Sequence, residues 1–174
     1  YQKVLYLYNS NVTLSFYTTM NILAHQVFKP LDIDISTSNY HISKIIEQIR
    51  DNKLSLFPDY SIRRSPWHRQ KQSSFIESIL ARIPIPSIYI DRRDDDNWKI
   101  IDGNERLCSI ANFCVFENLH LSGLNYFPDF EGYTFPELPG NLQRRIEETI
   151  IIAHEVSPGV PDDVYDNIFN RIRS

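Results

Sequence analysis

One stretch of the sequence, residues 97–114, constrains the fold more than any other. It begins as a short strand that ends in two isoleucines. It ends in a segment, residues 107–114, whose apolar side chains recur at the i, i+3, i+4, i+7 spacing of one helix face. The five residues between are Asp102-Gly103-Asn104-Glu105-Arg106, and they contain the only glycine in residues 1–122. We therefore expect a strand, a sharp turn that glycine permits, and a helix in immediate succession.

The five-residue turn has the features of an anion site. The N–H groups that open a helix have no intrahelical partner, and the helix dipole is positive at that end. With Arg106 beside them, these groups favour a phosphate. Asp102 is suited to a metal ion or a ribose hydroxyl. A surface turn capped by polar residues is the alternative, because short turn motifs recur by chance, and spacing alone leaves both open.

The composition is that of one soluble domain. The chain has 174 residues, of which 42% are hydrophobic and 23% charged, and no apolar run approaches the roughly 18 residues of a membrane span. It begins at Tyr1 without a secretory signal pattern, so we expect a cytoplasmic location and a fragment of a longer protein. Cys108 and Cys114 lie six residues apart on the expected helix, too far along its axis to bridge. Free, buried thiols are expected.

Periodicity predicts further elements, and their order indicates the fold class. Residues 31–35 alternate as a strand does, and isoleucines at helical spacing follow over residues 42–49, with N-cap candidates in Ser36–Asn39. The remaining predictions are a helix at 70–81, strands at 87–90 and 98–101 joined by a charged loop, a small hairpin around Glu131-Gly132, a helix at 141–148, a strand at 150–153 and a helix opened by Pro161. Short strands without a regular β-α-β period favour a compact α+β domain at 31–174. Residues 1–30 are expected to be an N-terminal arm or the end of an upstream segment.

A second candidate site lies in residues 50–72. This segment carries six basic and two acidic side chains, a net charge of +4 in a chain whose total is −4. Arg63 and Arg64 precede a proline, and arginine forks match phosphate oxygens. Trp67 is suited to stacking on a base, although large aromatic residues in loops usually pack. A non-enzymatic DNA-binding or sensing module, with Arg64, Arg69 and Lys71 on backbone phosphates, is therefore an alternative function.

Other polar residues are less informative. Glu77 lies at the edge of an apolar helix face, where it is suited to an arginine partner or a metal ion, or is an ordinary flanking charge. The run Asp94–Asp96 is expected to be a solvated turn, because consecutive side chains diverge. The histidines lack zinc-site spacing, and the sequence contains neither a P-loop nor a Rossmann motif. A nucleotide bound by this chain would therefore use a different turn.

Several segments together resemble the N-terminal domain of GmrSD-type restriction proteins. The family motif D-G-Q-Q-R or D-G-Q-E-R matches residues 102–106, with Asn104 in place of the first glutamine. The pattern P-x-Y-Q-R-x-x-V-W resembles residues 58–67, with Pro66 in place of valine, and L-I-E-S-I-L-x-x-x-P-I-P resembles residues 75–86. The resemblance covers roughly residues 31–173. That family looks like a variant of the ParB/sulfiredoxin fold, with a small mixed sheet flanked by helices.

The resemblance implies a nucleotide-binding, NTP-hydrolysing regulatory domain of a restriction or anti-phage defence system that acts on modified DNA. It also implies a nuclease domain or subunit, which is absent from this chain because no H-N-H-like segment occurs here. The expected ligands are a nucleoside triphosphate of unknown base and Mg²⁺, with DNA left open as a further partner and no membrane. The expected residues are Arg63, Arg64, Asp102, Gly103, Asn104 and Arg106 for the nucleotide, Asp102, Glu105 and Arg106 for catalysis, and Asp102 and Glu77 for the metal.

Overall fold

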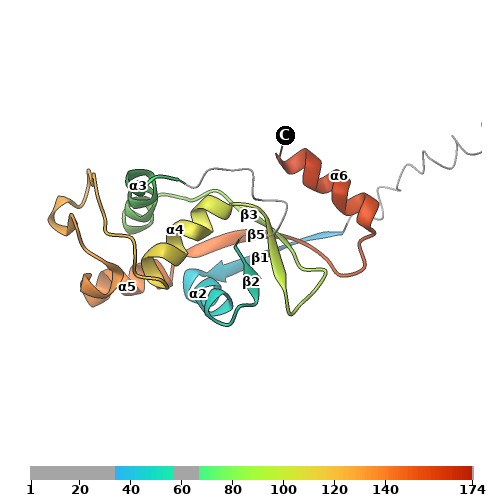
Figure 1. The fold of residues 1–174 in the computed structure, drawn as a ribbon, viewed down its shortest axis with the longest axis horizontal. Helices are drawn as coiled ribbons and strands as arrows, with labels where there is room; N and C mark the ends of the chain where they lie inside the picture. Colours follow the sequence, from blue (N-terminus) through green and yellow to red (C-terminus); the bar gives the residue numbers. More distant parts are fainter. Residues whose placement is uncertain (1–33, 57–66, 174) are drawn as a thin grey trace, which may run out of the picture. The chain divides into compact units, whose positions relative to one another are not determined.

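The computed structural model describes residues 34–56 and 67–173, and it has the predicted α+β architecture (Figure 1). The expected arm at 1–30, the first residues of the strand expected at 31–35, and Arg63 and Arg64 lie outside these ranges. The described elements are β1 (Ile35–His41), α2 (Ile42–Arg50), β2 (Leu54–Ser55), α3 (Arg69–Leu80), β3 (Ile88–Asp91), β4 (Trp98–Asp102), α4 (Asn104–Cys114), the 3₁₀ turns η3 (Pro128–Phe130) and η4 (Phe135–Glu137), α5 (Gly140–Glu147), β5 (Ile150–Val156) and α6 (Asp162–Arg173).

The strands form one mixed sheet in the order β1-β5-β3-β4-β2. The β3–β4 pair is antiparallel, as expected of a hairpin, and β1 pairs antiparallel with β5. The β3–β5 and β2–β4 pairs are parallel. In the β3–β4 loop the Asp94 carboxylate accepts the N–H of Asp96, and Asp95 pairs with Arg92. The aspartate run is therefore a solvated turn, as predicted.

The core joins the sheet to α2, α3, α4 and α5. Alternate residues of β3 and β4 face these helices, and the inward residues of α3 are those that the periodicity predicted. The fully buried residues include Ile42, Ile45, Ile76, Ile79, Ile88, Ile90, Ile100, Leu107, Ile110 and Phe113. Burying each such side chain contributes about 1.5–3 kcal/mol, so β4 and α4 are anchored on both sides of the turn that joins them.

The structure corrects two local predictions. Ser36–Asn39 do not cap a helix but lie inside β1, whose seven residues all pair with β5. The N–H of Ile42 instead bonds to the Thr149 carbonyl at 2.9 Å, so pairing with a distant strand outweighs local capping preference. The hairpin expected around Glu131-Gly132 is also wrong. That segment is irregular between η3 and η4, each of which contains a proline in its first turn.

The two cysteines are free and buried, as predicted. Burial, with a smaller contribution from the negative charge of Glu105, raises the pKa of Cys108 to about 11. Burial likewise raises the pKa of Cys114 to about 12. Both thiols are therefore protonated at neutral pH and behave as apolar core groups rather than nucleophiles. Among the described residues, none of the helices has the length and apolar character needed to cross a bilayer.

Candidate functional site

The predicted strand–turn–helix unit is present, and a single glycine makes it tight. β4 ends at Asp102, Gly103 adopts a left-handed conformation with φ 98°, and α4 begins at Asn104. The Gly103 carbonyl accepts the first intrahelical bond, from the N–H of Leu107 at 3.0 Å. A Cβ at Gly103 would lie 2.6 Å from Cγ2 of Ile88. Both the backbone angle and the neighbouring strand therefore exclude a side chain here.

The arginine of the turn is fixed in place beside the start of the helix. Nη2 of Arg106 donates to Oδ2 of Asp102 and to the Ser87 carbonyl, each at 3.0 Å. The Arg106 side chain keeps 16% of its surface exposed and that of Asp102 keeps 29%. Nε of Arg106 is buried and has no acceptor among the described residues. The guanidinium is therefore positioned by one carboxylate and one carbonyl and still has hydrogen-bonding capacity to spare.

Asn104 ties the turn to the residue that follows β2, the edge strand next to β4. Its Nδ2 donates to the Leu56 carbonyl at 3.0 Å. Leu56 is the last described residue before the segment that carries Arg63 and Arg64. The predicted nucleotide-binding roles of Arg63 and Arg64 fall outside the described residues and stay predictions.

Glu105 lies in the first turn of α4 and is partly exposed. An acidic residue at this position is favourable because the helix dipole is positive there. Its carbonyl accepts a bond from the Ser109 hydroxyl at 2.7 Å, and its charge acts on the Cys108 thiol one turn further on. The structure thus brings the predicted residues 102–106 together on one turn, and their catalytic and nucleotide-binding roles stay predictions.

Glu77, the second predicted metal ligand, has other partners. Its side chain is buried within α3, with 2% of the residue exposed. One oxygen, Oε1, accepts the backbone N–H groups of Asn125, Tyr126 and Phe127 at 2.8, 2.6 and 3.1 Å. These bonds account for the buried carboxylate without a metal ion. No group of three or more His, Cys, Asp or Glu side chains in the described part of the chain is arranged to hold a metal.

In residues 67–72, the described C-terminal end of the basic segment, Trp67 makes the main contacts. Its ring contacts Phe75 edge-on, with 5.8 Å between the ring centroids, which confirms the expectation that this tryptophan packs. The Lys71 ammonium lies 4.5 Å from the centre of the same ring, where a cation–π contact is favourable. Arg69 is exposed at the start of α3. DNA binding by Arg64, Arg69 and Lys71 stays a prediction.

Sequence reasoning missed the groups that complete the turn. The carbonyls of Ser87 and Leu56 orient Arg106 and Asn104, and Ile88 excludes a side chain at Gly103. Backbone carbonyls carry no sequence signal, and the partners lie 15 to 48 positions away along the chain. Only the pairing of neighbouring strands brings them to the turn.

Comparison with known proteins matches the chain to a family. The family model described as the GmrSD restriction endonuclease, N-terminal domain, matches residues 42–172. The match runs from the first residue of α2 almost to the end of α6, and it includes the whole of the turn. No curated protein and no solved structure matches the chain.

Proposed function

The chain belongs to this family of restriction-system domains, and we propose that its turn at residues 102–106 binds the phosphates of a nucleoside triphosphate. The observation that carries the proposal is the fixed Arg106 guanidinium beside the first N–H groups of α4. Backbone N–H groups, a helix dipole and an arginine fork each favour a phosphate, and here all three occur within one turn. Gly103 itself is buried against Ile88, whereas residues 104–106 are partly exposed at the start of α4.

The proposed roles follow from where each group lies. Arg106 neutralises phosphate charge, and Arg63 is the second arginine. The Asn104 amide is bonded to Leu56 and holds the turn against β2. Asp102 and Glu105 are the two carboxylates of the turn, and we assign them the orientation of the attacking water, a requirement of phosphoryl transfer.

The expected Mg²⁺ fits Asp102 better than Glu77. Mg²⁺ is usually held by one or two carboxylates together with phosphate oxygens and water, so a site with a single partly exposed carboxylate suits it. The Asp102 side chain is 29% exposed, whereas that of Glu77 is buried and bonded to three backbone N–H groups. When bound with a nucleotide, the ion would neutralise charge on the phosphates.

At the level of the system, we propose that nucleotide binding and hydrolysis in this domain regulate a separate nuclease part that acts on modified DNA. The family supports a restriction system with such a part.

A thermal-shift screen tests the nucleotide proposal. ATP, GTP, CTP and UTP are added with Mg²⁺ to the wild-type chain and to Arg106→Ala. A ligand at about 100 times its Kd stabilises the fold by roughly 2.7 kcal/mol, so we expect a higher Tm with at least one nucleotide in the wild type alone. Arg144→Ala is the matched control, because Arg144 is an exposed arginine of α5 away from the turn. Equal shifts in wild type and Arg106→Ala, or no shift with any nucleotide, would overturn the proposal.

A further inference from the structure

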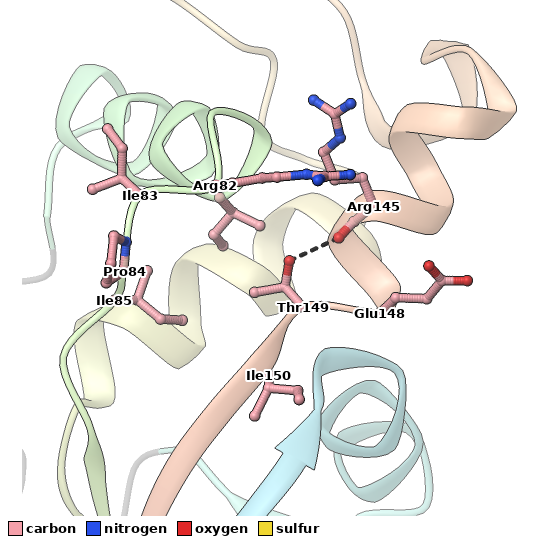
Figure 2. Close-up of a pocket in the computed structure, with 9 residues that line it drawn as sticks. Arg82, Ile83, Pro84, Ile85, Arg145, Glu148, Thr149 and Ile150 are labelled. Carbon is pink, nitrogen blue, oxygen red and sulfur yellow. Dashed lines mark hydrogen bonds between the residues drawn. The ribbon is translucent and has the colours of Figure 1, made fainter.

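A pocket of about 360 Å³ lies between the end of α3 and the junction of α5 with β5 (Figure 2). Its lining is mainly aliphatic and includes Ile83 and Ile150, which are 45% and 51% exposed. It also contains Pro84 and Ile85 of the P-I-P segment that the sequence analysis singled out. None of its lining residues belongs to the turn at residues 102–106, so the pocket is a separate candidate site.

Two arginines, Arg82 and Arg145, and one acidic residue, Glu148, border this pocket, and no ion pair joins either arginine to another described residue. Nη1 of Arg145 donates to the Leu80 carbonyl at the end of α3 at 2.9 Å. The side chain of Arg82 has no hydrogen bond or ion pair with any other described residue. Figure 2 shows the Arg82 side chain running from the end of α3 towards α5, while the Glu148 carboxylate is turned outward, away from the pocket. The pocket therefore combines aliphatic walls with an unpaired guanidinium.

The backbone at Arg82 is unusual for an arginine. Arg82 has φ 60°, in the left-handed region that glycine normally occupies after a helix. The N–H of Arg82 bonds to the Ile79 carbonyl and that of Ile83 to the Ser78 carbonyl, the paired bonds of a Schellman helix end. Glycine would satisfy the same bonds with less strain. A positive charge at the C-terminal end of a helix is favourable, but it does not require a residue in the left-handed conformation, so the Arg82 side chain is placed here at a cost in backbone strain.

We propose that this pocket binds a carboxylate carried on a branched aliphatic group. The arginine forks match the geometry of a carboxylate, and the isoleucine and proline side chains match the aliphatic part. The C-terminal ends of α3 and α5 also border the pocket, and their dipoles oppose negative charge, by less for a ligand with one negative charge than for a ligand with two. This favours a singly charged carboxylate over a phosphate dianion. A free branched acid and the C-terminal leucine of a polypeptide share this chemistry.

Calorimetric titration of the full chain tests the proposal with four probes. 4-Methylpentanoate represents the free acid, N-acetyl-leucine represents a chain terminus, and N-acetyl-leucine amide is the neutral control. Inorganic phosphate is the fourth. We expect at least one carboxylate to bind, with affinity at least tenfold above that of the amide and that of phosphate. The carboxylate that binds more tightly shows whether the ligand is a free acid or the C-terminus of a polypeptide. Binding by neither carboxylate, equal binding of the amide, or tighter binding of phosphate would overturn the proposal.

The variant Arg82→Gly separates a binding role from a structural one. Glycine suits the left-handed backbone, so this variant should keep or raise the Tm while carboxylate affinity falls at least fivefold. Arg144→Gln, which removes an exposed arginine of the same helix as Arg145, should leave the affinity unchanged. Unchanged affinity in Arg82→Gly would mean that Arg82 is only a cation at a helix end. A nucleotide screen that failed would not affect this result, because the two sites share no residue.

Discussion

Two of the helix ends that place a residue in the left-handed region, those at Gly103 and Arg82, use very different residues there. Before α4 the residue is Gly103, whose missing side chain leaves just enough room for Ile88. After α3 the residue is Arg82, whose exposed side chain lies along a pocket. At the first end, packing against Ile88 requires glycine, and the residue is buried. At the second end, packing does not require the strained residue, and the exposed arginine side chain is the group available to a ligand.

The arginines at the two sites differ in the same way. Arg106 is held by the Asp102 carboxylate and the Ser87 carbonyl, so its orientation is set before any ligand arrives. Arg82 has no such partner among the described residues, so a ligand that binds it must also order its side chain, which costs conformational entropy. We therefore expect the turn to bind its ligand more tightly and more selectively than the pocket does.

Gly103→Ala should produce the largest loss of stability. A left-handed alanine costs about 1–2 kcal/mol, and displacing Ile88 adds about 1–3 kcal/mol. We expect a lower midpoint of urea unfolding, equivalent to about 3 kcal/mol. Gly132→Ala is the matched control, because Gly132 has φ 84° but no atom within 4 Å of a Cβ, and it should lose only about 1 kcal/mol. Equal losses in the two variants would contradict the packing explanation.

Glu77→Gln tests whether the three backbone N–H groups bonded to Glu77 need a negatively charged acceptor. Charge-assisted hydrogen bonds are roughly twice as strong as neutral ones, so weakening three of them should cost about 2 kcal/mol. Hydrogen exchange at Asn125, Tyr126 and Phe127 should accelerate in the variant. Glu131→Gln is the control, since Glu131 accepts only two backbone N–H groups at an exposed site, and its cost should be below about 1 kcal/mol. A wild-type Tm that rose with Mg²⁺ alone, and did not rise in Glu77→Gln, would instead favour a metal at Glu77.

Arg82→Gly should produce the smallest change, of opposite sign. Removing an unfavourable left-handed arginine should raise the free energy of unfolding by up to about 1 kcal/mol, measured by urea unfolding. Asn52→Gly makes the same exchange at φ 57°, and it should gain less because asparagine tolerates this region better. A loss of stability in Arg82→Gly would show that the arginine side chain supports the fold, which would remove the contrast between the two helix ends.

Much of the fold follows from local patterns in the sequence. Helical spacing predicts α2, α3 and α4, and two β-rich runs with a charged loop predict the β3–β4 hairpin, because each signal arises within one element. The strand at Ser36–Asn39 escapes such reasoning, since its pairing partner, β5, lies over a hundred positions away. The loop fastened by Glu77 escapes it for the same reason, as the bonds span about 50 positions.

The turn at residues 102–106 and the pocket around Arg82 also differ in how much of each can be predicted from the sequence. The turn is contiguous, so its glycine, carboxylates and arginine can be picked out in the sequence as a candidate site, although their spacing alone leaves a surface turn as the alternative. The pocket joins Arg82 to Arg145 across 63 positions, and the strained φ of Arg82 leaves no mark in the sequence. Its chemistry becomes visible only when α3 and α5 lie against each other.

The most direct test of the central claim is an amide NMR titration of the full chain with the nucleotide that stabilises it best. If the phosphates bind at the turn, the largest chemical-shift changes should occur at the backbone N–H groups of Gly103, Asn104, Glu105 and Arg106, because these groups open α4. The same titration of Arg106→Ala should show no saturable change at these amides. Shifts confined to the pocket around Arg82, or to surface arginines and lysines, would contradict the assignment of the nucleotide to the turn.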